Sequence, residues 1–170
     1  MKSLIRTLMV IIITSVIALP GRAQTTKQQK QDEKAEKLRQ LIESRNFVFQ
    51  ATYMSPMGGG QIYLTSPYDV TISRDTVTSF LPYFGVAYMS TGYGSNDNGI
   101  KFTSTKFDYQ VQNLKKGGYR VIIKPKDVTN LTQMFLEAYP GGYASLSVIS
   151  VNRQQISFQG NVKERPKTKS

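Results

Sequence analysis

The spacing of apolar residues along the chain changes at Asn46. Before this point, apolar side chains recur at the three- and four-residue intervals of one helical face, at Ala35, Leu38, Leu41 and Ile42. After it, the interval becomes two, the period of a strand with one buried face; the first such set is Phe47, Phe49, Ala51 and Tyr53. The pattern therefore predicts one helix, from about Gln31 to Arg45, that packs against a β domain.

Short apolar runs separated by turn residues continue from here to position 162. Clusters such as Lys115–Gly118 and Pro140–Gly142 are typical of hairpin turns. We expect about eight or nine strands, drawn from the segments 47–54, 62–65, 70–72, 77–81, 100–104, 107–113, 119–125, 131–139, 143–152 and 156–162. Because hairpins join most neighbours, the fold class is mainly β: an antiparallel meander in a single domain, as a curled sheet, a sandwich or a partly closed barrel.

The N-terminal residues have the three parts of a secretory signal peptide. Lys2 and Arg6 give a positive start, an apolar run follows at 8–19, and small residues stand at Gly21 and Ala23. The run is shorter than the ~20 residues of a membrane span. We expect cleavage after Ala23 and a periplasmic or secreted protein; the alternative is an uncleaved N-terminal anchor.

Charge is concentrated toward the ends of the chain. The full sequence carries +11, the chain without the signal peptide 1–23 carries +8, and 47–162 carries only +3. We expect a flexible leader at 24–34 and a disordered basic tail at 163–170, on either side of a folded domain at 35–162. A nucleic-acid-binding protein would instead carry a basic stripe on its folded body, so no nucleic-acid partner is expected.

Residue types needed for common catalytic sites are missing. The sequence has no His and no Cys, which excludes Ser-His-Asp and Cys-His nucleophile systems and zinc sites built from His and Cys. Hydrolysis by two carboxylates remains as an alternative. The domain offers for it Asp69, Asp75, Asp97, Asp108, Asp127 and Glu137. No spacing pairs these residues, so we predict a protein that is not an enzyme and that holds no cofactor or metal.

The segment 81–104 is dense in Tyr, Gly and Asn, the residue types of adaptable contact surfaces. Our candidate binding residues are Tyr83, Phe84, Tyr88 and Tyr93. For the first two, the alternative is that they cover the open end of the sheet. Residues 95–99 superficially resemble a calcium loop, but they lack its alternating carboxylates and distal Glu, so a hairpin turn is favoured.

Four blocks of sequence carry a resemblance to a known family. They are Leu81-Pro82-Tyr83-Phe84-Gly85, Gly99-Ile100-Lys101-Phe102, Lys116-Gly117-Gly118-Tyr119, and Val151-Asn152-Arg153 with Ile156-Ser157-Phe158-Gln159-Gly160. The chain is similar, over roughly 38–162, to a family of exported Bacteroidetes proteins catalogued as a domain of unknown function, DUF4251. The resemblance implies a shared fold and compartment, and it carries over no catalytic residue. It also implies that Asp75-Thr76-Val77 is a candidate O-glycosylation signal, with Thr76 as the acceptor.

Together these features predict an exported, non-enzymatic binding or structural protein of the cell envelope. Its expected partner is an envelope glycan or protein, and the chain should not span the membrane after cleavage. The alternatives are a carboxylate-dependent hydrolase and a lipocalin-like carrier of a small apolar ligand, which would need an empty apolar interior.

Overall fold

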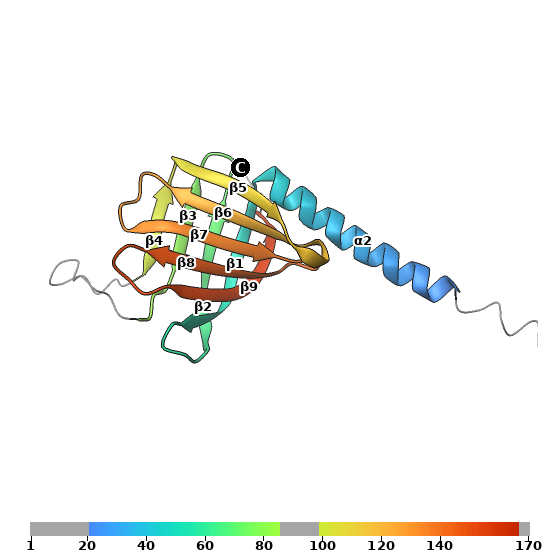
Figure 1. The fold of residues 1–170 in the computed structure, drawn as a ribbon, viewed down its shortest axis with the longest axis horizontal. Coiled ribbons are helices and arrows are strands. Elements are labelled where there is room, and N and C mark those ends of the chain that lie inside the picture. The colour runs from blue at the N-terminus through green and yellow to red at the C-terminus, as the bar shows by residue number, and fades with distance from the viewer. Residues whose placement is uncertain (1–20, 86–98, 167–170) are drawn as a thin grey trace, which may run out of the picture. The chain divides into compact units, whose positions relative to one another are not determined.

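The computed structural model describes residues 21–85 and 99–166 (Figure 1). One helix, α2 at Gly21–Ser44, precedes nine strands. The strands are β1 (Phe47–Pro56), β2 (Ile62–Ile72), β3 (Val77–Leu81), β4 (Ile100–Ser104), β5 (Phe107–Asn113), β6 (Tyr119–Pro125), β7 (Leu131–Ala138), β8 (Tyr143–Ser150) and β9 (Ile156–Glu164). A single 3₁₀ turn, η1 at Lys115–Gly117, lies between β5 and β6. Among the described residues, no helix is long and apolar enough to cross a membrane.

All nine strands belong to one antiparallel sheet, so the predicted meander is confirmed. The strand order is β4-β3-β2-β1-β9-β8-β7-β6-β5. Every pairing joins strands that follow each other in the chain, except β1 with β9, which brings the two ends of the meander together. The sheet curls so that β6, β7 and β8 pass in front of β1, β2 and β3 (Figure 1). Of the three architectures that the sequence left open, the structure has the nearly closed barrel.

The two edges of this sheet, β4 and β5, are consecutive in the chain. Only Thr105 and Lys106 separate them. β4 pairs with β3, while β5 pairs with β6, and the Lys126 amide donates to the Lys106 carbonyl over 2.7 Å to extend that second ladder. β4 and β5 therefore act as two halves of one bent strand that leaves one side of the barrel and joins the other. This bend closes the sheet.

Asp127 satisfies the backbone at this bend. Its carboxylate accepts hydrogen bonds from the Thr105 amide at 2.9 Å and the Lys106 amide at 3.2 Å, and a further one from the Ser104 hydroxyl. Backbone amides at a corner between two ladders lose their strand partner, and a carboxylate that accepts several of them replaces it. The hydrogen bond from the Ser104 hydroxyl is the largest cause that lowers the pKa of Asp127 to about 2, and the backbone hydrogen bonds add to it.

The inward faces of the strands form one hydrophobic core. Phe47, Phe49 and Phe158, on the adjacent strands β1 and β9, are fully buried at its centre. Val70, Val77, Val121 and Leu146 extend this core around the barrel. The inward-facing residues of the strands on all sides of the barrel thus fill its interior, as expected when a small barrel buries one face of each strand.

The C-terminal part of α2 packs on the barrel. Leu38 and Ile42 are buried in the core, and the Tyr109 hydroxyl donates to the Ile42 carbonyl over 2.9 Å. This bond satisfies one of the carbonyls that a helix leaves free in its last turn. Arg45 follows in a left-handed conformation (φ 51°), with its guanidinium carbon 4.7 Å from the centre of the Tyr109 ring. Burial raises the pKa of the Tyr109 hydroxyl, which keeps it a hydrogen-bond donor.

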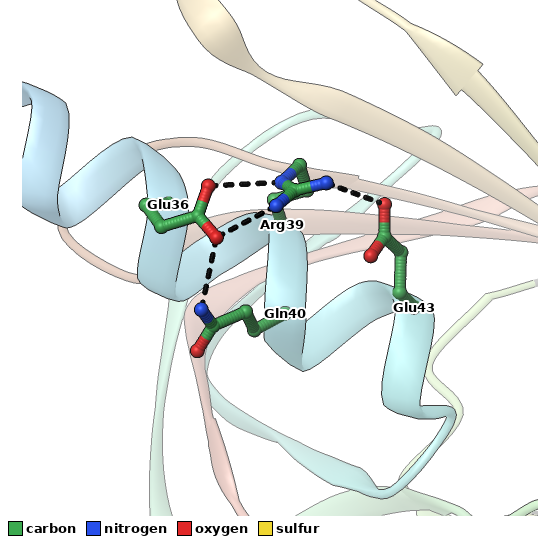
Figure 2. Close-up of polar contacts among 4 residues, drawn as sticks. All are labelled: Glu36, Arg39, Gln40 and Glu43. Carbon is green, nitrogen blue, oxygen red and sulfur yellow. Dashed lines mark hydrogen bonds and ion pairs between the residues drawn. The ribbon is translucent and has the colours of Figure 1, made fainter.

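The helix begins at Gly21 rather than near Gln31, so the predicted start of the helix is wrong and the segment 24–34, which we expected as a flexible leader, is helical. The segment is rich in Gln and Lys, which favour helix, and extending an existing helix avoids the cost of nucleation. The chain divides into compact units at Lys34 and Ala35. Within the second unit, the exposed face of α2 carries two ion pairs: Arg39 contacts Glu36 at 2.7 Å and Glu43 at 3.5 Å (Figure 2).

The pairing of β1 is irregular at Thr52. Ala51 lies opposite Gly160 and Tyr53 opposite Gln159, so Thr52 is an extra residue in β1. On the other side, Leu64–Pro67 of β2 lie opposite this same residue. We predicted two separate short strands here, on either side of Ser66-Pro67; the structure instead accommodates the proline within β2 as part of a bulge, where no ladder donor is required.

Candidate functional site

Tyr83, the first of the candidate binding residues, connects two distant segments. It follows the end of β3, and its hydroxyl donates to the Gln154 carbonyl in the turn between β8 and β9 over 3.3 Å. Its ring packs against the core and lies 4.9 Å from the guanidinium carbon of Arg153. Tyr83 thus connects the end of β3 to the β8–β9 turn.

Arg153 contacts both sides of the segment between β3 and β4. Besides stacking on Tyr83, its Nη1 donates to the Gly99 carbonyl over 3.3 Å, directly before β4. One side chain from the β8–β9 turn therefore holds the end of β3 and the start of β4 together. Three of the sequence blocks noted above meet at this point.

A small pocket opens beside Arg153. Its volume is about 140 Å³, similar to a cavity that holds one benzene ring (~150 Å³). The lining combines apolar side chains with backbone and cationic groups: Ile100, Phe102, Val128 and Leu131, with Lys101, Thr129, Asn130 and Arg153. The Nζ of Lys101 also lies 4.8 Å from the centre of the Phe80 ring.

Of the four candidate binding residues, two are described by the structure, and these two differ in exposure. Tyr83 is half-buried in the contacts given above, whereas the Phe84 side chain is 63% exposed. Tyr88 and Tyr93 lie outside the described residues, as does the calcium-like stretch up to position 98. Arg153, which stacks on Tyr83, also lines the pocket described above.

The candidate carboxylates have separate partners. Arg120 of β6 contacts Glu137 of β7 at 2.5 Å. Lys126, directly after β6, contacts Asp108 of the paired strand β5 at 2.6 Å. Asp127 binds the backbone of the barrel bend. Each of these three carboxylates serves a local contact that stabilises the fold.

The remaining carboxylates lie in other parts of the sheet. Asp75 accepts from the hydroxyls of Ser73 at 3.1 Å and Thr76 at 3.3 Å in the β2–β3 turn, and the Ser73 bond is the main cause of its lowered pKa. Asp69 is half-buried on β2, and this burial raises its pKa. Asp97 lies outside the described residues. Within the described chain, no group of three or more carboxylates is placed to hold a metal ion.

Thr76, the candidate glycosylation acceptor, is half-buried. Its carbonyl accepts from the Ser73 amide over 2.8 Å, and its own hydroxyl donates to Asp75. The turn is thus fixed by hydrogen bonds, and Asp75 next to it is exposed.

A second surface, around Tyr53 and Tyr63, lies outside the four candidate binding residues predicted from the sequence. Alternation places Tyr53 on the same face as Phe49, but the extra residue Thr52 reverses the parity, so Tyr53 is 37% exposed and Met54 is buried. On the outside of the barrel, Tyr53 meets Tyr63 of β2 edge to face, with ring centres 5.4 Å apart. A one-residue bulge leaves no local signal in the sequence.

Polar groups adjoin this tyrosine pair. Gln61 donates from Nε2 to Oε1 of Gln159 over 3.1 Å, and Gln159 is the register partner of Tyr53. Next to Gln159, a shallow depression of about 250 Å³ is lined by Tyr139, Tyr143, Ala144, Ser145, Gln159 and Gly160. The Tyr143 side chain is 72% exposed. This outer face therefore combines exposed rings with uncharged hydrogen-bonding groups.

Comparisons with known proteins agree with this fold. A search of curated proteins found no match. A crystal structure of a DUF4251 family protein from Bacteroides eggerthii DSM 20697 is similar in fold, with a TM-score of 0.59 and 18% sequence identity, over 77% of this chain and 87% of that one. The family model described as "Domain of unknown function (DUF4251)" matches residues 29–162, nearly the whole barrel and part of the helix. The chain therefore belongs to the DUF4251 family.

Proposed function

We propose that the protein is exported and acts as a non-enzymatic binding protein of the cell envelope. Its partner would be contacted at the end of the barrel where the residues after β3 meet the β6–β7 and β8–β9 turns. The observation that carries this proposal is the double contact of Arg153 with Tyr83 and Gly99, which fixes the rim of a pocket.

Exposure of apolar side chains around this rim supports the proposal. Phe84 is 63% exposed and Val151 is 62% exposed, on two different connections at the same end of the barrel. Large apolar groups that remain exposed beside a pocket are a feature of protein and ligand contact sites. A hydrolase is disfavoured because Glu137, Asp108 and Asp127 are each engaged in a local structural contact. A lipocalin-like carrier is disfavoured by the large side chains that fill the described core.

A capture experiment from the native envelope tests the binding site. Tagged wild-type protein and the variant Phe84→Ala would be compared, with Tyr63→Ala as a matched loss of an exposed ring on the outer face. We expect Phe84→Ala to lose a partner that wild type and Tyr63→Ala both retain. Equal capture by all three proteins, or a loss confined to Tyr63→Ala, would contradict the proposed site.

One intact-mass measurement on protein from the native host tests both export and modification. Export predicts a mature chain that begins at Gln24, and glycosylation predicts added mass that disappears in Thr76→Ala. A chain that retains residues 1–23 would refute cleavage, and an unmodified mass would refute glycosylation independently.

A further inference from the structure

We propose that the outside of the barrel carries a second binding site, for an uncharged saccharide. The site is a row of four residues that we name the outer tyrosine row: Ser145, Gln159, Tyr53 and Tyr63. It is distinct from the Arg153 pocket and goes beyond the function proposed above.

The pairing of the strands builds the row. Ser145 of β8 lies opposite Gln159 of β9, Gln159 opposite Tyr53 of β1, and Tyr53 opposite Tyr63 of β2. Four adjacent strands at ~4.8 Å spacing extend the row over about 14 Å. Such a row suits an elongated ligand that lies across the strands.

The two tyrosines provide stacking surfaces of fixed orientation. Their rings meet at an angle of 64°, so that they are held against each other, and Tyr63 remains 61% exposed. An aromatic ring has a negative face and packs well against weakly positive C–H groups. The apolar face of a pyranose ring presents such C–H groups, and its hydroxyls point outward around the edge.

The amides beside the rings suit those hydroxyls. Each Gln side chain has two donors and an acceptor oxygen, and the bond between Gln61 and Gln159 uses one donor of the first and one acceptor position of the second. That bond fixes both amides and leaves each with further donor and acceptor capacity at an exposed position. Sugar hydroxyls both donate and accept, so a pair of amides complements them.

The shape of the surface next to the row fits a sugar ring. The depression of about 250 Å³ lies between Tyr139, Tyr143 and Gln159 and has room for a ring with its substituents. Its lining includes Ala144 and Gly160, which lie opposite each other on β8 and β9. A saccharide on the tyrosine pair would reach this depression past Gln159.

The lack of charged side chains on this surface favours an uncharged saccharide over an acidic one. The residues of the row and of the depression carry no charged group. The register neighbour of Ser145 on β7 is Glu137, which is already paired with Arg120. An acidic glycan would have to compete with Glu137 for Arg120, whereas an uncharged one loses no ionic hydration. An extended peptide is disfavoured because β9 and β1 are paired on both sides and offer no free edge.

The test uses the side-chain NH₂ signals of Gln61 and Gln159 in ¹H–¹⁵N NMR spectra. Wild-type protein would be titrated with the neutral tetrasaccharides of glucose (β1,4), mannose (β1,4) and N-acetylglucosamine (β1,4), and with tetragalacturonate as an acidic comparator. We expect at least one neutral tetrasaccharide to shift both amide signals, and the acidic one to leave them unchanged. We also expect Tyr63→Ala to weaken binding about tenfold, as for the loss of one ring contact, while Tyr63→Phe retains it.

Phe84→Ala is the matched control for this titration, because it removes an exposed ring at the Arg153 pocket and should bind the saccharide like wild type. Three results would overturn the inference: no shift at Gln61 and Gln159 with any neutral tetrasaccharide, undiminished binding by Tyr63→Ala, or binding of tetragalacturonate alone. Loss of binding in Phe84→Ala would instead move the saccharide to the Arg153 pocket and overturn the outer site. The two variants therefore test the two proposed sites independently.

Discussion

Gly160 of β9 lies against the backbone of the neighbouring strand β1. A Cβ atom added here would lie 1.9 Å from the Gln50 carbonyl oxygen, 2.9 Å from the Gln50 carbonyl carbon and 3.0 Å from the Ala51 Cα. All three are backbone atoms of β1, which cannot rotate away as the end of a side chain could. The change Gly160→Ala would therefore have to push β1 and β9 apart by about 1 Å or more to reach an ordinary contact distance.

The expected cost follows from what that movement breaks. Both strands are paired on both sides, so a shift at Gly160 strains the ladders to β2 and β8 as well. Losing two ladder hydrogen bonds costs about 2 kcal/mol at ~1 kcal/mol each, and overpacking adds about 1–3 kcal/mol. We expect Gly160→Ala to lower the free energy of unfolding by about 3–5 kcal/mol, a large part of the 5–15 kcal/mol of a typical domain.

Urea unfolding measures this difference. The chain has ten Tyr and no Trp, so tyrosine fluorescence and far-ultraviolet circular dichroism are suitable probes. The midpoint should fall while the slope stays near that of wild type, because the surface exposed on unfolding hardly changes. Gly58→Ala is the matched control: its added Cβ meets nothing within 4 Å, so its stability should stay within about 0.5 kcal/mol of wild type. If Gly160→Ala behaved like Gly58→Ala, the close approach of β1 to β9 would be wrong.

Two further predictions concern the polar contacts that attach the helix and close the barrel. Tyr109→Phe removes the hydroxyl bond to the Ile42 carbonyl and should cost about 1 kcal/mol in urea unfolding; no loss would mean that this bond does not hold α2. Asp127 has a folded pKa of about 2 against an ordinary 3.8, so its contribution should be complete above about pH 4 and disappear as the pH falls toward 2. The stability difference between wild type and Asp127→Asn, measured by urea unfolding at pH 2 to 6, should therefore shrink toward pH 2, and a constant difference would contradict this role.

The strands whose pairings are local could be predicted from the sequence, because alternation and turn residues suffice for them. In β3, for example, Val77, Ser79 and Leu81 are all buried, as their spacing indicates. The closure of the barrel could not be predicted, because it depends on the pairing of β1 with β9, more than a hundred residues apart, and on the bend between β4 and β5. Alternation inside each strand is the same whether a sheet stays open or closes.

Of the residues around the Arg153 pocket, Tyr83 and Phe84 are binding candidates predicted from the sequence, but Arg153 is not. Tyr83 and Arg153 both stand in sequence blocks, but nothing in their spacing indicates that one stacks on the other. The outer tyrosine row was not predicted for a different reason. The two-residue alternation of apolar side chains predicts that Tyr53 faces inward like Ala51, but the extra residue Thr52 reverses the face of every side chain after it. The error began at Thr52, where the pairing of β1 with both of its neighbours is irregular.

The bulge that exposes Tyr53 also explains why position 160 is a glycine. At Thr52 the pairing of β1 with β9 shifts by one residue, next to the place where the Gln50 carbonyl approaches Gly160. A side chain at 160 would press on the same irregular stretch of β1 that turns Tyr53 toward Gln159. Gly160→Ala should therefore change the amide signals of Gln61 and Gln159 in the folded protein and weaken any saccharide bound to the outer tyrosine row. Tyr109→Phe, which removes a contact of the edge strand β5, should leave those signals and that binding intact. If both variants lost binding in proportion to their stability, the row would depend on the general stability of the fold and not on this bulge.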